Sequence, residues 1–155
     1  MGNGYTIRCR KCSYEYQAML GFGMLFPTVY EDTVKAIREG KLGEEYKKFF
    51  EEHKDAAINC EACAAVCTGC GKFDTVKDYG LYLPKKETGD VNFGCVTAEE
   101  LNEGYKQVMK YGHKCSACGG DLKVIDLFDE LAKHALKCPE CGGEMYLTED
   151  LLMWD

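Results

Sequence analysis

The chain has 155 residues, of which 29% are charged and 46% hydrophobic, a composition typical of a globular protein. Its formal net charge is -7, and four-thiolate metal sites would make the charge more negative. Nucleic-acid binding depends largely on Lys and Arg that neutralise phosphates. The charge therefore argues against a nucleic-acid partner.

Ten of the eleven cysteines form five Cys-x-x-Cys pairs. In a reducing compartment such pairs are more often metal ligands than disulfides. The first residues lack a basic stretch followed by an apolar run, and no window of about 18 apolar residues occurs. We therefore expect a cytoplasmic protein with no signal peptide and no membrane contact.

The first expected element is a hairpin whose turn is a metal-binding knuckle. Residues 5–8 are β-prone, Cys9 and Cys12 form the knuckle, and residues 14–17 alternate in polarity. The apolar run at 19–27 then predicts a buried, tightly turning connection. It does not match a phosphate-binding loop, because it has neither a third glycine in register nor a following Lys-Ser/Thr pair.

Two helices are expected next, at 28–39 and 44–53, because apolar residues recur at helical spacing and Gly40 is a plausible stop. His53 should be an exposed helix residue rather than a catalytic one. We interpret the segment at about 27–55 as an insertion between the two halves of the first metal site.

The second knuckle repeats the strand–knuckle–strand pattern of the first. Cys67 and Cys70 lie between β-prone residues 64–66 and 73–76, and Gly71 follows, as Gly119 follows Cys118 and Gly142 follows Cys141. Glycine tolerates the positive φ that a zinc knuckle can require when its amides point at the thiolates. The stretch 79–95, which is interrupted by Pro and Gly, is expected to be an irregular link.

Thr97 and Glu100 form a capping-box pattern that predicts a helix over 98–110. In the C-terminal half, 19 residues separate Cys118 from Cys138, a spacing typical of zinc sites. A short helix at 126–135 fits between these knuckles. The last residues, 145–147 and 151–154, resemble strand and packing material.

The pattern of knuckles predicts which pairs share a metal. Cys115/Cys118 should join Cys138/Cys141. Cys9/Cys12 should join Cys67/Cys70, because both pairs lie at strand-to-strand turns and loop closure costs modest entropy. The alternative is a local site built from Cys60, Cys63, Cys67 and Cys70, holding zinc or an iron–sulfur cluster.

Three cysteines remain outside these sets, and His113 lies two residues before Cys115. Cys60 and Cys63 lie among alanines and are expected to be buried as small apolar residues, with a redox dithiol as the alternative. Cys95 is single and is expected to be packed. His113 should be a solvent-facing strand residue; the alternatives are a metal ligand or a donor to a thiolate.

The chain resembles a group of uncharacterised bacterial zinc-ribbon proteins, rubredoxin-like with two four-cysteine sites. The resemblance rests on Cys9-Arg-Lys-Cys12 with the run 20–27, the turn 40–43, Cys67-x-x-Cys70-Gly71, residues 83–85 and the ending 153–155. It implies two four-cysteine ribbons and treats Cys60 and Cys63 as departures from the pattern. It transfers no activity.

We therefore predict a small α+β protein with two rubredoxin-like zinc ribbons. The expected division is an N-terminal ribbon with a helical insertion at 1–78, a linker and helix at 79–110, and a C-terminal ribbon at 111–155. Two zinc ions would be held by Cys9, Cys12, Cys67, Cys70, Cys115, Cys118, Cys138 and Cys141.

The predicted function is an interaction or adaptor module with a protein partner and no enzymatic activity, because no catalytic motif is present. Two alternatives stay open. One is a thiol redox or metal-sensing protein that uses Cys60 and Cys63, with Cys95 as a further candidate. The other is a nucleic-acid-binding zinc ribbon.

Overall fold

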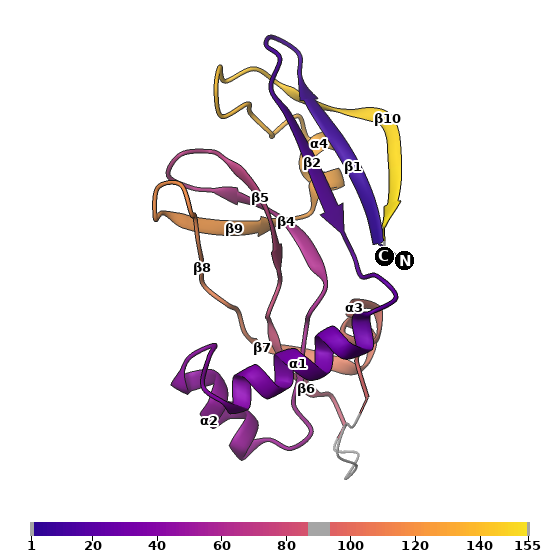
Figure 1. The fold of residues 1–155 in the computed structure, drawn as a ribbon, viewed down its shortest axis with the longest axis vertical. Coiled ribbons are helices and arrows are strands. Elements are labelled where there is room, and N and C mark those ends of the chain that lie inside the picture. Colours follow the sequence, from indigo (N-terminus) through magenta and orange to yellow (C-terminus); the bar gives the residue numbers. More distant parts are fainter. Residues whose placement is uncertain (1, 87–93, 155) are drawn as a thin grey trace. The chain divides into compact units, whose positions relative to one another are not determined.

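The structure is a computed structural model, which describes residues 2–86 and 94–154 (Figure 1). Within these residues it is a small α+β fold with four helices and three antiparallel sheets. This agrees with the predicted α+β class.

The chain forms two compact units, each assembled from separate stretches. Unit 1 consists of Met1–Gly23, Ala62–Lys77 and Gly112–Asp155, and unit 2 of Met24–Glu61 and Asp78–Tyr111. This grouping differs from the predicted consecutive segments 1–78, 79–110 and 111–155. The reason is that the strands of unit 1 pair across both intervening stretches, so both of those stretches fold into unit 2.

The first sheet of unit 1 has the order β10-β1-β2. It contains β1 (Gly2–Cys9), β2 (Glu15–Leu20) and the last strand β10 (Met145–Trp154). The β1–β2 hairpin confirms the first predicted element. The N- and C-terminal strands run antiparallel beside each other, from Gly2 opposite Trp154 to Cys9 opposite Met145 (Figure 1).

The second sheet of unit 1 has the order β5-β4-β9-β8. Its strands are β4 (Ala62–Cys67), β5 (Phe73–Lys77), β8 (His113–Lys114) and β9 (Asp121–Ile125). Helix α4 (Leu127–Ala132) follows and is shorter than the predicted 126–135. It begins where the carboxylate of Asp126 accepts hydrogen bonds from the amides of Phe128 and Asp129, both at 3.0 Å.

One apolar core joins the two sheets of unit 1. Its buried members come from both sheets and from the α4 region: Ile7, Cys9, Ala18, Ala64, Phe73, Leu127, Leu136, Cys138 and Met145. The ring of Tyr16 stacks on Phe73 with 5.5 Å between centroids. Because β1, β4 and β10 contribute to the same core, neither sheet is an independent folding domain.

Unit 2 combines helices with a small sheet. Helix α1 (Phe26–Arg38) and α2 (Glu44–Glu52) lie within two residues of the predicted helices, and Gly40 and Gly43 turn the chain between them with φ of 78° and 104°. The sheet has the order β3-β6-β7, from β3 (Ala57–Ile58), β6 (Leu81–Pro84) and β7 (Tyr105–Met109).

The predicted helix at 98–110 is only half correct. Helix α3 (Ala98–Gly104) has the expected capping box of Thr97 and Glu100, but the chain then continues as β7. Strand β7 pairs with β6, which lies in the stretch 79–95 that we expected to be irregular. Gly104 weakens the helix, and strand pairing with β6 satisfies the backbone beyond it. The residues 87–93 of that stretch lie outside the described part.

The run 19–27 is also not the buried connection that we expected. The side chains of Met24 and Leu25 are 75% and 69% exposed. Gly21, with φ of 84°, forms a bridge to Ala62, and strand β2 ends just before it. The backbone of this run is thus held by a bridge to β4, while the side chains of Met24 and Leu25 are left in solvent.

Candidate metal centres

Eight cysteines converge into two groups in unit 1. The outer cysteine group contains Cys9, Cys12, Cys138 and Cys141, and the inner cysteine group contains Cys67, Cys70, Cys115 and Cys118. Within each group all four Sγ atoms lie within 4.8 Å of one another. The eight residues that the sequence singled out are therefore brought together as two sets of four.

The spacing of the sulfurs fits one tetrahedral ion per group. The Sγ atoms are 3.4 Å apart for Cys9 and Cys141, and 3.6 Å for Cys12 and Cys138. In the inner group the distances are 3.4 Å for Cys67 and Cys118, and 3.8 Å for Cys70 and Cys115. Four sulfurs at about 2.3 Å from a zinc ion would stand roughly 3.8 Å from one another. Four thiolates in this arrangement suit zinc and also iron.

All four knuckles close with the same backbone hydrogen bond. In each, the amide of the first cysteine donates to the carbonyl five residues later, at 2.7–3.0 Å: Cys9 to Tyr14, Cys67 to Lys72, Cys115 to Gly120 and Cys138 to Gly143. In the last three knuckles a glycine amide also donates back to the carbonyl of the first cysteine. These glycines, Gly71, Gly119 and Gly142, have φ near +70°, as the sequence pattern predicts.

Backbone amides point at the thiol sulfurs. The amide of Lys11 lies 3.3 Å from the Sγ of Cys9, and the amide of Gly69 lies 3.3 Å from that of Cys67. The amide of Gly120 lies 3.4 Å from the Sγ of Cys118. Such hydrogen bonds stabilise the thiolate form, which is the form that binds a metal.

Each group holds one acidic thiol beside a less acidic one. The pKa of Cys67 is lowered to about 6. The main cause is the hydrogen bond from the amide of Cys70, which together with those from the amide of Gly69 and the thiol of Cys118 outweighs the effect of burial. The Gly120 amide acts to lower the pKa of Cys118, but its neighbours Cys67 and Cys70 raise it to about 11. The contact between the Sγ atoms of Cys67 and Cys118 therefore favours the thiolate on Cys67.

The outer group repeats this asymmetry. Burial acts to raise the pKa of Cys9, but the amides of Lys11 and Cys12 outweigh it and lower this pKa to about 6. The backbone of Tyr14 acts to lower the pKa of Cys12, yet burial and the neighbouring thiols raise it to about 12. In both groups the first cysteine of one knuckle, Cys9 or Cys67, is therefore the thiol whose pKa is lowered.

The predicted pairing of the knuckles is wrong. Cys9 and Cys12 join Cys138 and Cys141 rather than Cys67 and Cys70, and the pairs at 67/70 and 115/118 join each other. Strand pairing is the cause, because β1 pairs with β10 and β4 pairs with β9. The local alternative built from Cys60, Cys63, Cys67 and Cys70 is also not the grouping found.

Glycines that face the sulfurs are site residues that sequence reasoning missed. A Cβ atom on Gly143 would lie 2.8 Å from the Sγ of Cys9, and one on Gly120 would lie 3.3 Å from the Sγ of Cys67. Gly69 likewise faces the sulfurs of Cys67 and Cys118, at 3.7 and 3.5 Å. The sequence contains a signal for two of these glycines, because Gly120 and Gly143 each follow a Cys-x-x-Cys-Gly pattern as a second glycine.

The other three cysteines lie outside both groups. Cys60 is 3% exposed, which agrees with the expected burial, whereas Cys63 on β4 is only half-buried. Cys95 is also half-buried. Because Cys60 falls in unit 2 and Cys63 in unit 1, the two cysteines of this Cys-x-x-Cys pair belong to different compact units.

The histidines differ from expectation in two cases. His113, expected on a solvent-facing strand, is 9% exposed on β8 and belongs to neither cysteine group. His53 is half-buried, with its ring 4.7 Å from that of Phe49, rather than exposed. His134 is exposed, and its Nδ1 lies 2.7 Å from a carboxylate oxygen of Glu144.

Two of the three cationic residues around the first knuckle, Arg8, Arg10 and Lys11, have acidic partners within unit 1. Arg8 forms an ion pair with Glu15 at 2.5 Å, and Arg10 lies 3.5 Å from Glu144 and stacks over Tyr146.

Within residues 2–86 and 94–154, no helix has the length and apolar character needed to cross a membrane. Comparisons of the chain with protein-family models, with curated proteins and with solved structures found no match.

Proposed function

We propose that this protein is a zinc-binding interaction module in which both cysteine groups hold structural zinc as rubredoxin-like ribbons. The observation that carries the proposal is the donor set: among the described residues, each group consists of four thiol sulfurs with no histidine or carboxylate. A catalytic zinc keeps a position for water, whereas a site of four cysteines is closed. This donor set supports a function without catalysis at the metal.

The position of the two groups supports a structural role. The outer group lies where β1 meets β10, and the inner group lies where β4 meets β9. Each ion would join two knuckles that are far apart in the sequence. Structural zinc binding contributes on the order of 10 kcal/mol, comparable to the whole stability of a small domain. Zinc in these groups would therefore fix the strand pairing of unit 1.

The surface of the first sheet supports an interaction role. Strand β10 is an edge strand, and three apolar side chains on it are 40–70% exposed: Leu147, Leu152 and Met153. Open strand edges and exposed apolar side chains are features of surfaces that bind other proteins. We propose a protein partner for this surface and a cytoplasmic location, where the thiols would stay reduced.

The metal part is tested by elemental analysis and X-ray absorption on the purified chain. We expect two zinc ions per chain, each with four sulfur neighbours at about 2.3 Å and no oxygen or nitrogen neighbour. Iron in place of zinc, or a light-atom ligand in either site, would contradict structural zinc and favour redox or hydrolytic chemistry.

The interaction part is tested with a surface variant. A Leu152→Lys/Met153→Lys double variant should keep both metal ions and lose a partner that the wild-type protein captures at equal concentration. A matched control is Lys48→Glu, because Lys48 is an exposed residue of unit 2. Equal capture by the wild type and the double variant would remove β10 as the contact surface.

A further inference from the structure

Unit 2 contains a hollow that the metal sites do not use. It encloses about 670 Å³ and is lined by residues of α1, of α2 and of the segment that follows α2, and by Gly94. Small-molecule sites usually enclose roughly 300–1,000 Å³ and combine apolar walls with a few polar groups. The size of this hollow lies within that range.

The wall of the hollow is apolar. Tyr30 and Ala56 are buried, and Val34 and Phe50 are half-buried. The hydroxyl of Tyr30 is engaged below the surface, where it accepts a hydrogen bond from the amide of Ile58 at 3.4 Å. The exposed face of this wall is therefore formed by aromatic and aliphatic groups that can contact an apolar ligand body.

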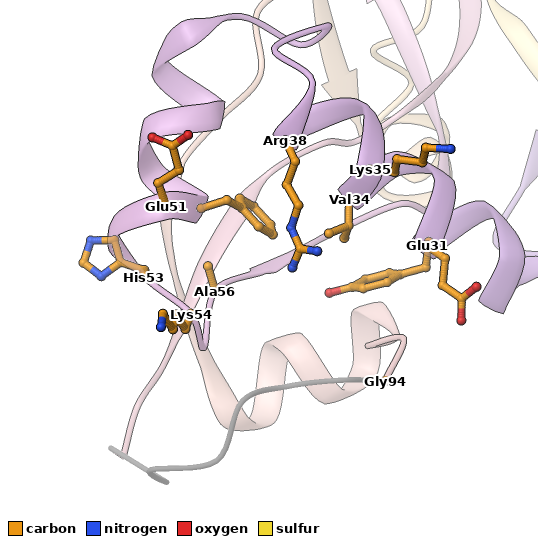
Figure 2. A pocket seen from close by; sticks show the side chains of 11 residues that line it. Glu31, Val34, Lys35, Arg38, Glu51, His53, Lys54, Ala56 and Gly94 are labelled. Atoms are coloured by element: carbon orange, nitrogen blue, oxygen red, sulfur yellow. The ribbon is translucent and has the colours of Figure 1, made fainter.

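The charged side chains that line the hollow are three cations and two carboxylates, in a chain whose net charge is -7. Lys35, Arg38 and Lys54 line it together with Glu31 and Glu51. Figure 2 shows the guanidinium of Arg38 extending into the hollow, while the carboxylates of Glu31 and Glu51 point outward at its edges.

The donors of Arg38 are not occupied by a carboxylate of the described chain. Among the residues that the structure describes, none lies at ion-pair distance from Arg38 or Lys54, although other exposed cations of unit 2 have such partners, as Lys41 has Glu39 and Lys48 has Glu52. A planar guanidinium matches carboxylate and phosphate oxygens with two parallel hydrogen bonds.

We propose that this hollow binds a small organic anion. Its acidic group, a carboxylate or a phosphate, would be held by Arg38 with Lys54 nearby, and its apolar body would lie against Tyr30, Val34 and Phe50. The site is independent of the cysteine groups, because every residue that lines it belongs to unit 2.

The test uses the metal-loaded full chain and the fluorescent probe anilinonaphthalene sulfonate, which joins an aromatic body to an acidic group. We expect saturable binding of one probe per folded chain, with amide chemical-shift changes confined to α1, α2, residues 53–56 and Gly94. Displacement of the probe by phenyl phosphate or by benzoate, and not by benzyl alcohol, would show that the acidic group is required. Failure of both acids to displace it would overturn the proposal.

Variants distinguish the contribution of the Arg38 charge to probe binding from that of the apolar wall. Arg38→Gln should weaken probe binding about tenfold or more, because it removes a charged hydrogen-bond donor, and Arg38→Lys should restore part of the loss. The neutral analogue phenylnaphthylamine should bind equally to wild type and Arg38→Gln. Lys48→Gln, which removes a positive charge outside the hollow, is the matched control. An equal effect of Arg38→Gln and Lys48→Gln would overturn the proposal, as would shift changes elsewhere in the chain.

Discussion

The pairing of the four knuckles can be tested by counting metal ions in double variants. In the structure, Cys9 and Cys141 share the outer group, whereas Cys9 and Cys67 belong to different groups. The Cys9→Ser/Cys141→Ser variant should therefore keep one metal ion that resists EDTA. The Cys9→Ser/Cys67→Ser variant should keep none.

The expected loss of stability depends on how well each cysteine group is arranged to hold an ion. The four Sγ–Sγ distances of 3.4–3.8 Å lie close to the edge of a zinc–thiolate tetrahedron, so each group could hold one ion with little rearrangement. Loss of one site should remove on the order of 10 kcal/mol, which is comparable to the entire stability of a domain. The variant that lacks both sites should accordingly show no cooperative thermal transition for unit 1, while the variant that keeps one should retain a weakened transition.

The assay is elemental analysis after dialysis against EDTA, combined with thermal unfolding. Cys95→Ser is the matched control, because Cys95 lies outside both groups, and it should keep two metal ions. The sequence-based pairing predicts the reverse result for the two double variants. One retained ion in Cys9→Ser/Cys67→Ser and none in Cys9→Ser/Cys141→Ser would refute the strand pairing described above.

Three further predictions concern local features. Gly143→Ala should destabilise the protein by about 1–3 kcal/mol, because its Cβ would lie 2.8 Å from the Sγ of Cys9, whereas Gly112→Ala, with open space around the added atom, should be close to neutral in chemical denaturation. Thr97→Ala should cost about 1 kcal/mol by removing the cap of α3, and Thr97→Ser should recover most of it in the same measurement. Calorimetry in several buffers should show about one more proton released per site on metal uptake as the pH falls from 7.5 to 5. The reason is that the thiols of Cys9 and Cys67, with pKa near 6, are thiolates above pH 6 and protonated below it.

Each of these three predictions can be contradicted by the same measurement that tests it. Equal stability of the two glycine variants would mean that the close approach at Gly143 is relieved by a shift of the knuckle. An unchanged stability of Thr97→Ala would mean that α3 does not depend on its cap. A proton count that stays constant between pH 7.5 and 5 would contradict the lowered pKa values of Cys9 and Cys67.

Local features were the ones that the sequence could predict. The helices near 28–39 and 44–53 were found within two residues, since apolar spacing and glycine stops act within one segment. The capping box of Thr97 and Glu100 was correct for the same reason. The end of α3 was not, because the change to β7 at Tyr105 depends on pairing with β6.

The burial of single residues was harder to predict. His113 was expected in solvent but is buried, and Met24 and Leu25 were expected in the core but are exposed. Side-chain burial depends on which strands and helices cover a segment, and single-residue polarity carries little of that information. The hollow beside Arg38 was not found for a related reason, since it exists only where α1 and α2 pack together.

The sequence by itself determined the eight cysteines, the knuckle geometry and the positive φ of Gly71, Gly119 and Gly142, because each depends on residues within one turn. Only the tertiary structure decided which knuckles meet. All four knuckles share the Cys-x-x-Cys spacing, and loop-closure entropy grows slowly with loop length, so neighbours in the chain have little advantage. The pairing of β1 with β10 and of β4 with β9 around one shared core made that choice.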